Sequence, residues 1–407
     1  MKCRHCRAEL VTTFLDLGSA PPSNAYLSTA QLRAPEVCYP LRLLVCESCW
    51  LVQTEDHAGR EALFADDYAY FSSFSTSWLD HSRRYVDAMR RRFALDRGSL
   101  VVEVAANDGY LLQYVQQAGI PCYGIEPTAS TAAAARAKGI EIVGRFFGVD
   151  LATELAAQGR QADLIAANNV LAHVPDINDF AAGFARLLKA QGVATFEFPH
   201  LMCMAALNQF DTAYHEHYSY LSLGTVRRVL EAAGLQVFDV EELTTHGGSL
   251  RVFAQRHGGV HPVAPAVAAL LAREGAAGLE RPAYYRGFQA RAERVKDDLL
   301  RYLLDAKAAG RRVAAYGAAA KGNTLLNFAG VRPDLVAFVA DRNPAKQGRY
   351  MPGSRIPIVG EQRLREERPQ DILLLPWNLR AELLAQLSYA REWGARFVTA
   401  VPALEVS

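Results

Sequence analysis

The sequence predicts an α/β protein in which two doubly wound units follow a short, metal-stabilised N-terminal segment. Two Cys-x-x-Cys pairs lie near the N-terminus, apolar runs of strand length alternate with helical patterns from residue 100, and a second such cycle begins near residue 311. Short strands separated by helices of about ten to fifteen residues are typical of βαβ units and a parallel sheet. We therefore expect three parts, covering residues 1–65, 66–260 and 261–407.

The N-terminal segment has an irregular sequence with no long amphipathic run. Such a segment cannot build a sufficient core of its own and needs a staple. Four cysteines in two Cys-x-x-Cys pairs can surround one Zn²⁺ tetrahedrally and leave no coordination position for water. These cysteines are Cys3, Cys6, Cys46 and Cys49. We expect a structural zinc site here; four ordinary buried cysteines are the alternative.

The first α/β unit begins near residue 100 and should end in an antiparallel hairpin. Apolar runs of strand length, separated by helical patterns, occupy 100–106, 122–127, 163–170 and 193–199. Two further strand patterns, 235–243 and 250–256, are joined only by a Gly-containing turn, which is too short for a parallel crossover. A parallel sheet finished by such a hairpin is typical of a class I methyltransferase domain, which is Rossmann-like.

The second α/β unit follows a mostly helical stretch, 262–310, which we interpret as a linker and a long helix. Its expected strands are 311–318, 335–342, 371–377 and 395–402. Their alternation with helical patterns predicts a second Rossmann-like domain at the C-terminus.

Composition and charge argue against several classes of protein. The 44 Lys and Arg residues balance 43 Asp and Glu, for a formal net charge of +1, whereas a nucleic-acid binder usually carries a basic excess or stripe. No apolar run approaches the roughly 18 residues of a membrane helix, and the N-terminus lacks the apolar region of a signal peptide. Seven cysteines, four of them paired for a metal, suit a reducing compartment. We expect a cytoplasmic protein without nucleic-acid or membrane partners.

Polar residues at the carboxyl ends of the predicted strands indicate a cofactor site, because doubly wound sheets bind nucleotides at that edge. A carboxylate about twenty residues after the first strand commonly binds ribose hydroxyls, and Glu126 has that place. The candidate cofactor-binding residues are Glu103, Ala105, Asn107, Glu126, Asn168 and Asn169. NAD and S-adenosylmethionine both contain such a ribose, so this pattern leaves both open, as well as a plain structural turn.

The segment from Tyr214 to Tyr220 is the densest cluster of proton-handling side chains, reading Tyr-His-Glu-His-Tyr-Ser-Tyr. It is not a zincin helix, because its second histidine does not follow four residues after the first. A histidine, with its unperturbed pKa of about 6.5, suits general-base work near neutrality, and Glu216 could orient the ring of His217. His173 belongs to the same edge of the predicted sheet. A surface-exposed polar loop is the alternative.

Ahead of the first strand, Tyr68 and Tyr70 offer hydroxyls on an otherwise apolar wall to which Phe71 belongs. We expect Tyr70 and Phe71 to bind the substrate, although core packing alone would also explain this aromatic run.

A diphosphate site is expected in the C-terminal unit, where a segment from Tyr316 to Asn323 links a strand to a helix. Backbone amides and Lys321 can bind phosphate at such a helix start. Asn323 stands where a Walker A loop requires lysine, which argues against a P-loop NTPase. Arg251, beside a Gly-rich turn, is a further candidate for phosphate, and a structural turn is the alternative at both places.

Taken in order along the chain, these motifs resemble the sugar C-methyltransferases of deoxysugar biosynthesis, and the resemblance covers nearly the whole chain. YHEHYSY and AKGNTLLN are its most specific segments. The zinc segment, DYAYFSSFS, EVAANDGYLL, GIEP, NNVLAHVPDINDF, THGGSLRV and DRNPAKQGRYMPGSRIPI also match. Ala105-Ala106 and His200 depart from the residues more usual in the family, which affects mainly substrate detail.

The resemblance implies S-adenosylmethionine as cofactor and a dTDP-4-keto-6-deoxysugar as substrate, methylated beside its ketone, at C3 in our prediction, with C5 left open. It implies that His217 abstracts a proton, that Glu216 and Tyr214 support it, and that Tyr68 and His173 flank the sugar. The C-terminal unit would hold the nucleotide diphosphate. We expect a monomer or weak homo-oligomer.

Three other functions compete with this one. Both α/β units could house the dinucleotide of a nicotinamide-dependent nucleotide-sugar oxidoreductase, although neither has a clean GxGxxG. A zinc-ribbon nucleic-acid-binding protein is opposed by the near-zero net charge. An O- or N-methyltransferase of the same fold would act on a heteroatom instead of an enolate.

Overall fold

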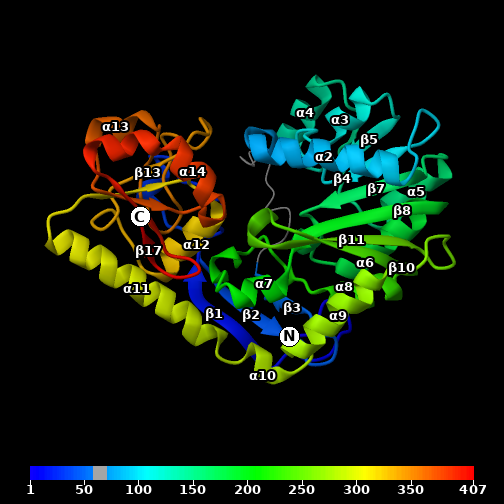
Figure 1. Ribbon diagram of the computed structural model, residues 1–407, viewed down its shortest axis with the longest axis horizontal. Coiled ribbons are helices and arrows are strands. Elements are labelled where there is room, and N and C mark those ends of the chain that lie inside the picture. The colour runs from blue at the N-terminus through cyan, green and yellow to red at the C-terminus, as the bar shows by residue number, and fades with distance from the viewer. Residues whose placement is uncertain (58–70) are drawn as a thin grey trace.

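The computed structural model describes residues 1–57 and 71–407 and shows two α/β lobes that meet at a shared base (Figure 1). A small N-terminal sheet forms that base, with helix α11 (Phe288–Ala308) along the C-terminal lobe and helix α9 (Pro265–Ala277) under the other lobe. The strand orders are β1-β2-β3-β9 in the N-terminal sheet, β10-β11-β8-β7-β4-β5-β6 in the larger lobe and β14-β13-β12-β15-β16-β17 in the C-terminal lobe.

The N-terminal sheet is antiparallel and consists of β1 (Thr12–Ala20), β2 (Tyr39–Val45), β3 (Val52–Thr54) and β9 (Ser219–Tyr220). The prediction of an irregular segment is therefore wrong, while its apolar side chains pack in a core shared with α11 and the C-terminal lobe. Phe14 is buried and stacks on Phe288 of α11 with ring centroids 4.5 Å apart. Two register shifts interrupt the pairing of β1 with β2. Bulges of this kind break the two-residue alternation by which strands are recognised in a sequence.

The seven-stranded sheet confirms the predicted parallel sheet with its antiparallel hairpin. Strands β6, β5, β4, β7 and β8 are parallel, and β11 pairs antiparallel with both β8 and β10. The bounds are β4 (Val101–Val104), β5 (Cys122–Ile125), β6 (Ile142–Val143), β7 (Ala162–Asn168), β8 (Leu188–Pro199), β10 (Leu235–Leu243) and β11 (Ser249–Arg256). This is a class I methyltransferase topology, in which the carboxyl ends of β4, β5 and β7 share one edge.

The C-terminal lobe has the second parallel sheet that the sequence predicted, closed by one antiparallel edge strand, β17. Its strands are β12 (Val313–Tyr316), β13 (Val339–Ala340), β14 (Ile358–Val359), β15 (Asp371–Leu374), β16 (Arg396–Thr399) and β17 (Glu405–Val406). The strand expected at 335–342 is reduced to two paired residues, because only Val339 and Ala340 pair with β12 and β14.

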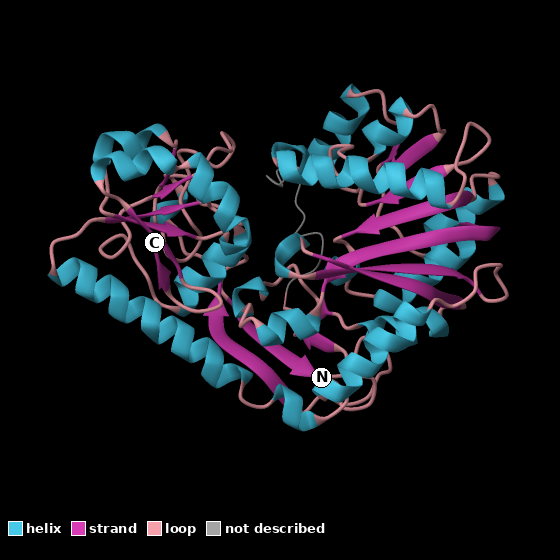
Figure 2. Cartoon of the chain, in the orientation of Figure 1, coloured by secondary structure: helices cyan, strands magenta, loops and turns pink. Residues whose placement is uncertain are grey.

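Helices cover both faces of the two large sheets (Figure 2). Besides α9 and α11, the α-helices of the described residues are α2 (Thr76–Arg92), α3 (Leu112–Gln117), α4 (Ala129–Ala137), α5 (Val149–Ala157), α6 (Ile177–Leu187), α7 (Leu201–Ala206), α8 (Leu223–Ala232), α10 (Pro282–Tyr285), α12 (Ala320–Phe328), α13 (Gln362–Glu367) and α14 (Arg380–Gln386). Helix α6 shows why these segments fold: Asp176 caps its first turn, and its apolar face buries Phe180 and Phe184 against Phe147.

Within residues 1–57 and 71–407, no helix combines the length and apolar character needed to cross a lipid bilayer.

Candidate active site

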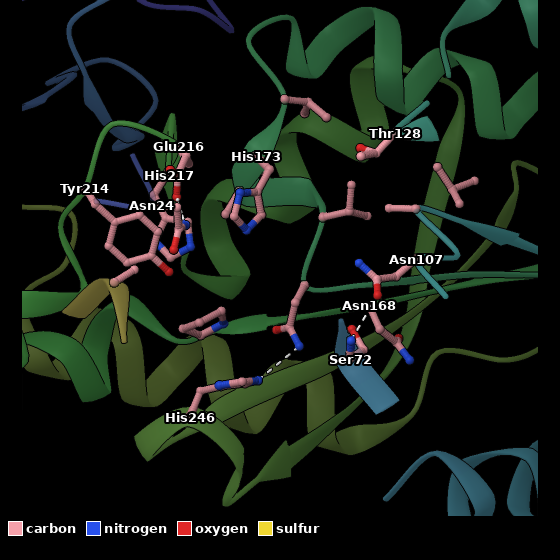
Figure 3. A pocket seen from close by; sticks show the side chains of 18 of the residues that line it. Asn24, Ser72, Asn107, Thr128, Asn168, His173, Tyr214, Glu216, His217 and His246 are labelled. Carbon is pink, nitrogen blue, oxygen red and sulfur yellow. Dashed lines mark hydrogen bonds between the residues drawn. The ribbon is translucent and has the colours of Figure 1, made fainter. Parts of the chain in front are cut away.

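A cavity of about 400 Å³ lies at the carboxyl edge of the seven-stranded sheet and reaches the C-terminal lobe. Its walls include Ala105, Glu126 and Asn168 from the sheet edge, and Lys321 and Asn378 from the C-terminal lobe. Figure 3 shows Asn107, Thr128 and Asn168 on one side, Tyr214, Glu216 and His217 on the other, and His173 between them. One cavity thus joins three groups of residues that lie far apart in the sequence.

At the sheet side, the turn after β4 approaches the cavity closely. Ala105 and Asn107 have positive φ angles of 60° and 48°, a conformation usually given to glycine. Asn107 is one of the residues that tolerate this conformation, whereas Ala105 adopts it at a steric cost. The carboxylate of Glu126 accepts the backbone N–H groups of Asn107 and Thr128, each at 2.9 Å. Burial raises the pKa of Glu126, and its carboxyl group lies where a ribose would bind.

Two neighbouring amides at the end of β7 supply polar groups to the cavity. Asn168 is 5% exposed, and neither its Oδ1 nor its Nδ2 has a hydrogen-bond partner among the described residues. The amide of Asn169 donates to Nε2 of His246 at 3.1 Å. An unpaired buried amide costs about 1–3 kcal/mol. Asn168 therefore fits a polar ligand, and the small residues and buried carboxylate beside it fit the ribose and amino-acid parts of a nucleoside cofactor.

The opposite side of the cavity holds a histidine with a defined tautomer. Nδ1 of His217 lies 3.0 Å from the carbonyl oxygen of Thr212. A carbonyl can only accept, so Nδ1 carries the proton and Nε2 keeps its lone pair. Burial, followed by the proximity of His173, holds the pKa of His217 well below its usual value. The imidazole is therefore in its basic form at neutral pH.

Other predicted proton-handling residues surround His217. The Tyr214 ring lies 3.9 Å from the His217 ring, and the His173 ring meets it edge-on at 4.6 Å, as centroid distances. Burial lowers the pKa of His173 to about 4, although a backbone bond to Glu216 raises it in part. Burial raises the pKa of Glu216 to about 7, and its carboxylate accepts from Asn24 at 2.7 Å. Thr212, and not Glu216 as predicted, fixes the His217 tautomer.

The C-terminal lobe contributes a buried cation. Lys321, in the first turn of α12, donates to Oδ1 of Asn378 at 2.8 Å, and its Nζ lies 4.5 Å from the centroid of the Trp377 ring. Burial lowers the pKa of Lys321 to about 8, and Asp211 partly opposes that shift. Asp211 is buried in the other lobe and accepts from Trp377 Nε1 at 2.7 Å. Positive charge is thus available where the lobes meet.

Three residues predicted to bind the substrate, Arg251, Tyr316 and Asn323, have other partners in the structure and do not line the cavity. Arg251 is buried in β11 and forms ion pairs with Glu197 at 2.6 Å and Glu241 at 2.7 Å. The Tyr316 hydroxyl donates to Glu361 at 3.0 Å. Asn323 is fully buried and donates to the carbonyl of Ser23 at 3.3 Å.

Two other predicted residues, Glu103 and Phe71, do not line the cavity, and two more lie outside the described part of the chain. Glu103 is fully buried in β4 below the cavity, and burial raises its pKa well above its usual value. The Phe71 ring packs edge-on against Phe74, with centroids 5.8 Å apart. Tyr68 and Tyr70 lie outside the described residues.

Several cavity residues were not predicted to be functional. They are Asn24, Trp78, Thr212, His246, Lys346 and Asn378. His246 lies in a Gly-rich turn, and that turn was the sequence feature that could have pointed to it. In the structure His246 has a positive φ angle of 55°. Asn24 comes from an ordinary Pro-Pro-Ser-Asn turn, so nothing in the sequence marks its contact with Glu216.

The predicted metal ligands form a compact group. Sulfur atoms of Cys3, Cys6, Cys46 and Cys49 all lie within 4.8 Å of one another, and Cys3–Cys49 and Cys6–Cys46 are each 3.5 Å apart. Tetrahedral zinc with Zn–S bonds of about 2.3 Å requires similar sulfur separations. Gln53 donates to the sulfur of Cys3 at 3.3 Å, which is the kind of support that orients a metal ligand. The residues therefore fit a closed, structural zinc site.

Comparisons with known proteins match all three parts of the chain. Family models match residues 3–64 (zinc binding domain), 78–240 (methyltransferase domain) and 244–402 (C-methyltransferase C-terminal domain). The C-methyltransferase NovU of Streptomyces niveus is 35% identical over 401 residues, which cover 98% of this chain and 95% of NovU.

Two solved methyltransferases show more distant likeness. The magnesium protoporphyrin IX methyltransferase (ChlM) of Synechocystis PCC 6803, with bound SAH, is 17% identical, covering 44% of this chain and 83% of its own, with a TM-score of 0.36. An S-adenosylmethionine-dependent methyltransferase of Mesorhizobium loti is 16% identical, covering 44% of this chain and 100% of its own, with a TM-score of 0.34.

The motifs alone left two reactions open, methyl transfer and oxidoreduction. The sequence matches favour methyl transfer, because they are all to methyltransferases. With its four-cysteine zinc site, its class I topology and a NovU match that spans nearly both chains, this chain belongs to the S-adenosylmethionine-dependent C-methyltransferase family.

Proposed function

We propose that this enzyme methylates a carbon beside the ketone of a nucleotide-linked sugar, and that the substrate is a dTDP-4-keto-6-deoxysugar methylated at C3. The observation that carries the proposal is His217, which lines the same cavity as Glu126, the expected ribose ligand of the cofactor, and whose Nε2 is left unprotonated by the Nδ1–Thr212 bond. A ketone acidifies the hydrogens on its neighbouring carbons, so a base in that place can generate the carbon nucleophile that C-methylation requires.

In the proposed reaction, His217 Nε2 takes a proton from the sugar carbon, and the electrons of the C–H bond form an enolate. When bound, S-adenosylmethionine would supply an electrophilic methyl group; as the enolate carbon bonds to this methyl, the methyl–sulfur bond would break and S-adenosylhomocysteine would leave. Thr212 keeps holding the Nδ1–H of the resulting imidazolium. His173 and Tyr214, both in contact with His217 and both lining the cavity, would stabilise the enolate oxygen and align the sugar.

The nucleotide would extend toward the C-terminal lobe, where Lys321 and Lys346 line the cavity near the start of α12. These two ammonium groups suit a diphosphate better than Arg251, whose guanidinium is committed to two carboxylates. The proposal therefore keeps the predicted diphosphate site at Lys321, adds Lys346 and leaves out Arg251.

The decisive experiment measures solvent deuterium exchange into dTDP-4-keto-6-deoxysugars by NMR, with and without S-adenosylmethionine. We expect exchange at C3 and conversion of that carbon to a methylated one when the cofactor is added. Exchange and methylation at C5 would correct the position, whereas neither result with several such sugars would contradict the sugar substrate. Analysis of the methylated product also separates carbon from oxygen or nitrogen methylation.

Replacing Glu126 with Gln should weaken S-adenosylmethionine binding about 10- to 100-fold, because hydrogen bonds to a charged group contribute about 1.5–3 kcal/mol. Isothermal titration calorimetry measures the change. Glu141→Gln is the matched control, since Glu141 carries the same charge but is exposed. Equal affinities for the wild type and Glu126→Gln would show that Glu126 does not hold the ribose.

Replacing Lys321 with Ala should weaken dTDP binding about tenfold or more and leave S-adenosylmethionine binding unchanged, because only the nucleotide would contact this ammonium group. Lys307→Ala removes a cation from the exposed surface of α11 and serves as control. Parallel loss of both affinities in calorimetry would point to a general distortion of the cavity and count against a diphosphate role.

A further inference from the structure

A buried arginine, Arg4, connects the zinc-binding knuckle, which is the turn from Cys3 to Cys6, to the side of the cavity that holds His173 and His217. Arg4 lies between the ligands Cys3 and Cys6 and is 5% exposed. Its Nε donates to the carbonyl of Tyr218 and one terminal nitrogen to that of Pro175, both at 3.3 Å. Its remaining bonds reach the Thr54 carbonyl at 2.8 Å and both carboxylate oxygens of Asp56 at 2.8 and 2.5 Å.

The two cavity-side carbonyls belong to the segments that carry the histidine pair. Tyr218 directly follows His217, and Pro175 lies two residues after His173 and itself lines the cavity. The hydroxyl of Thr54 donates to the carbonyl of His217 at 3.1 Å, from the same strand that Arg4 holds. One guanidinium thus ties the zinc segment to the backbone of both histidine segments.

The connection continues to the metal ligands. Gln53 accepts the backbone N–H of Arg4 at 2.9 Å and donates to the Cys3 sulfur at 3.3 Å. On the outer side of the knuckle, Nδ1 of His5 lies 2.8 Å from Oδ1 of Asn178 at the start of α6, two residues past the cap. Placing the four cysteines therefore also places Arg4 against the cavity wall.

Only the planar fork of arginine can make these contacts. Its five N–H donors point in fixed directions in one plane, whereas a lysine has one compact ammonium group. The ion pair with Asp56 does not explain the arginine by itself, because the Asp56 side chain is 57% exposed and exposed pairs contribute little. The bonds to buried carbonyls are the feature that requires this residue.

We propose that Arg4 is a positioning residue for the catalytic site: through its carbonyl contacts, the zinc knuckle sets how His173 and His217 meet across the cavity. The zinc segment then has a role in the reaction as well as in stability. The effect of Arg4 on catalysis rests on the proposed function. Its effect on the positions of His173 and His217 is a property of the free protein and can be measured without substrate.

The experiment compares histidine titrations in the full-length, zinc-loaded protein by NMR of ¹³Cε1-labelled histidine. His173→Asn and His217→Asn variants assign the two signals. In the wild type, burial keeps both pKa values low, at about 4 for His173. In Arg4→Met, the two segments separate and water reaches the rings, so both pKa values should rise toward 6.5, the ordinary value.

Two controls separate positioning from stability. Arg42→Met removes a comparable arginine from the same sheet, where Nε and a terminal nitrogen bond Glu55 at 3.1 and 2.5 Å. Asp56→Asn keeps the Arg4 fork but removes its exposed counter-ion. Both variants should leave the histidine titrations unchanged. If Arg4→Met fails to fold, Arg4→Lys, which keeps the charge and loses the fork, replaces it and should raise the same two pKa values.

Unchanged histidine titrations in an Arg4 variant that has a lower melting temperature would overturn the proposal and leave Arg4 a structural role only. With substrate in hand, Arg4→Met should lower kcat with little change in KM for the nucleotide, and move the acid limb of the pH–rate profile upward. Raised histidine pKa values together with no deuterium exchange in the wild type would support the positioning role while contradicting the sugar substrate.

Discussion

The His217→Asn variant should methylate about 10²–10⁴-fold more slowly than the wild type, the range that a general base typically contributes. Asparagine can keep a hydrogen bond to the Thr212 carbonyl through its amide nitrogen, but it has no basic nitrogen in the place of Nε2. Solvent deuterium exchange should be lost in parallel, because exchange depends on the same proton transfer. Affinity for S-adenosylmethionine should stay at the wild-type value, since the expected cofactor ligands lie on the other side of the cavity.

The pH dependence gives a second check on this assignment. His217 is a base whose pKa lies well below 6.5, so activity should be constant through neutrality and fall only as acid protonates the imidazole. His257→Asn, at an exposed histidine, is the matched control. Near wild-type turnover in His217→Asn, or an acid limb above pH 6.5 in the wild type, would assign the base to another residue.

Replacing Cys46 with Ser should remove the zinc ion and unfold the N-terminal sheet. In small zinc domains the metal contributes on the order of 10 kcal/mol, and the loss here should be smaller, because β1, β2 and β3 also bury apolar side chains in a core shared with α11. We expect the zinc content to fall from one ion per chain to none, with a marked decrease in melting temperature. Elemental analysis and calorimetry measure the two effects.

Cys38→Ser is the control for this variant, because Cys38 is exposed and outside the metal-binding group. It should change neither zinc content nor melting temperature. A Cys46→Ser protein that retained zinc at full stoichiometry and melted like the wild type would show that the four cysteines do not form one site.

The strands and helices that could be predicted from the sequence are those with a clear pattern of apolar residues. The strands β4, β5, β7 and β8 lie in mostly apolar runs, and the short link before β11 could only be a hairpin. The N-terminal sheet was missed because its strands are bulged, and because β9 comes from a distant part of the chain. Pairing between segments so far apart leaves no periodic signal in either of them.

The cavity was predicted to the extent that its residues occur in motifs. Glu126, Asn168, His173, His217 and Lys321 were all named from the sequence and all line it. Lys346 and Asn378 line it from the C-terminal lobe, and their place depends on how the two lobes face each other, which no local pattern encodes. Arg251 shows the converse: beside a Gly-rich turn it suggested phosphate binding, but the register of β11 places its guanidinium next to Glu197 on β8.

The late strand β9 has a consequence for the order in which the chain assembles during synthesis. All four cysteines leave the ribosome early, so zinc can gather β1, β2 and β3 while the rest of the chain is still being made. The edge of β3 then stays open until Ser219 and Tyr220 emerge and pair with it. An open strand edge invites pairing with other chains. Since β9 directly follows His217 and Tyr218, the pairing that closes this edge also places His217 at the cavity. We therefore expect a nascent chain to be most prone to aggregation before this segment has been made.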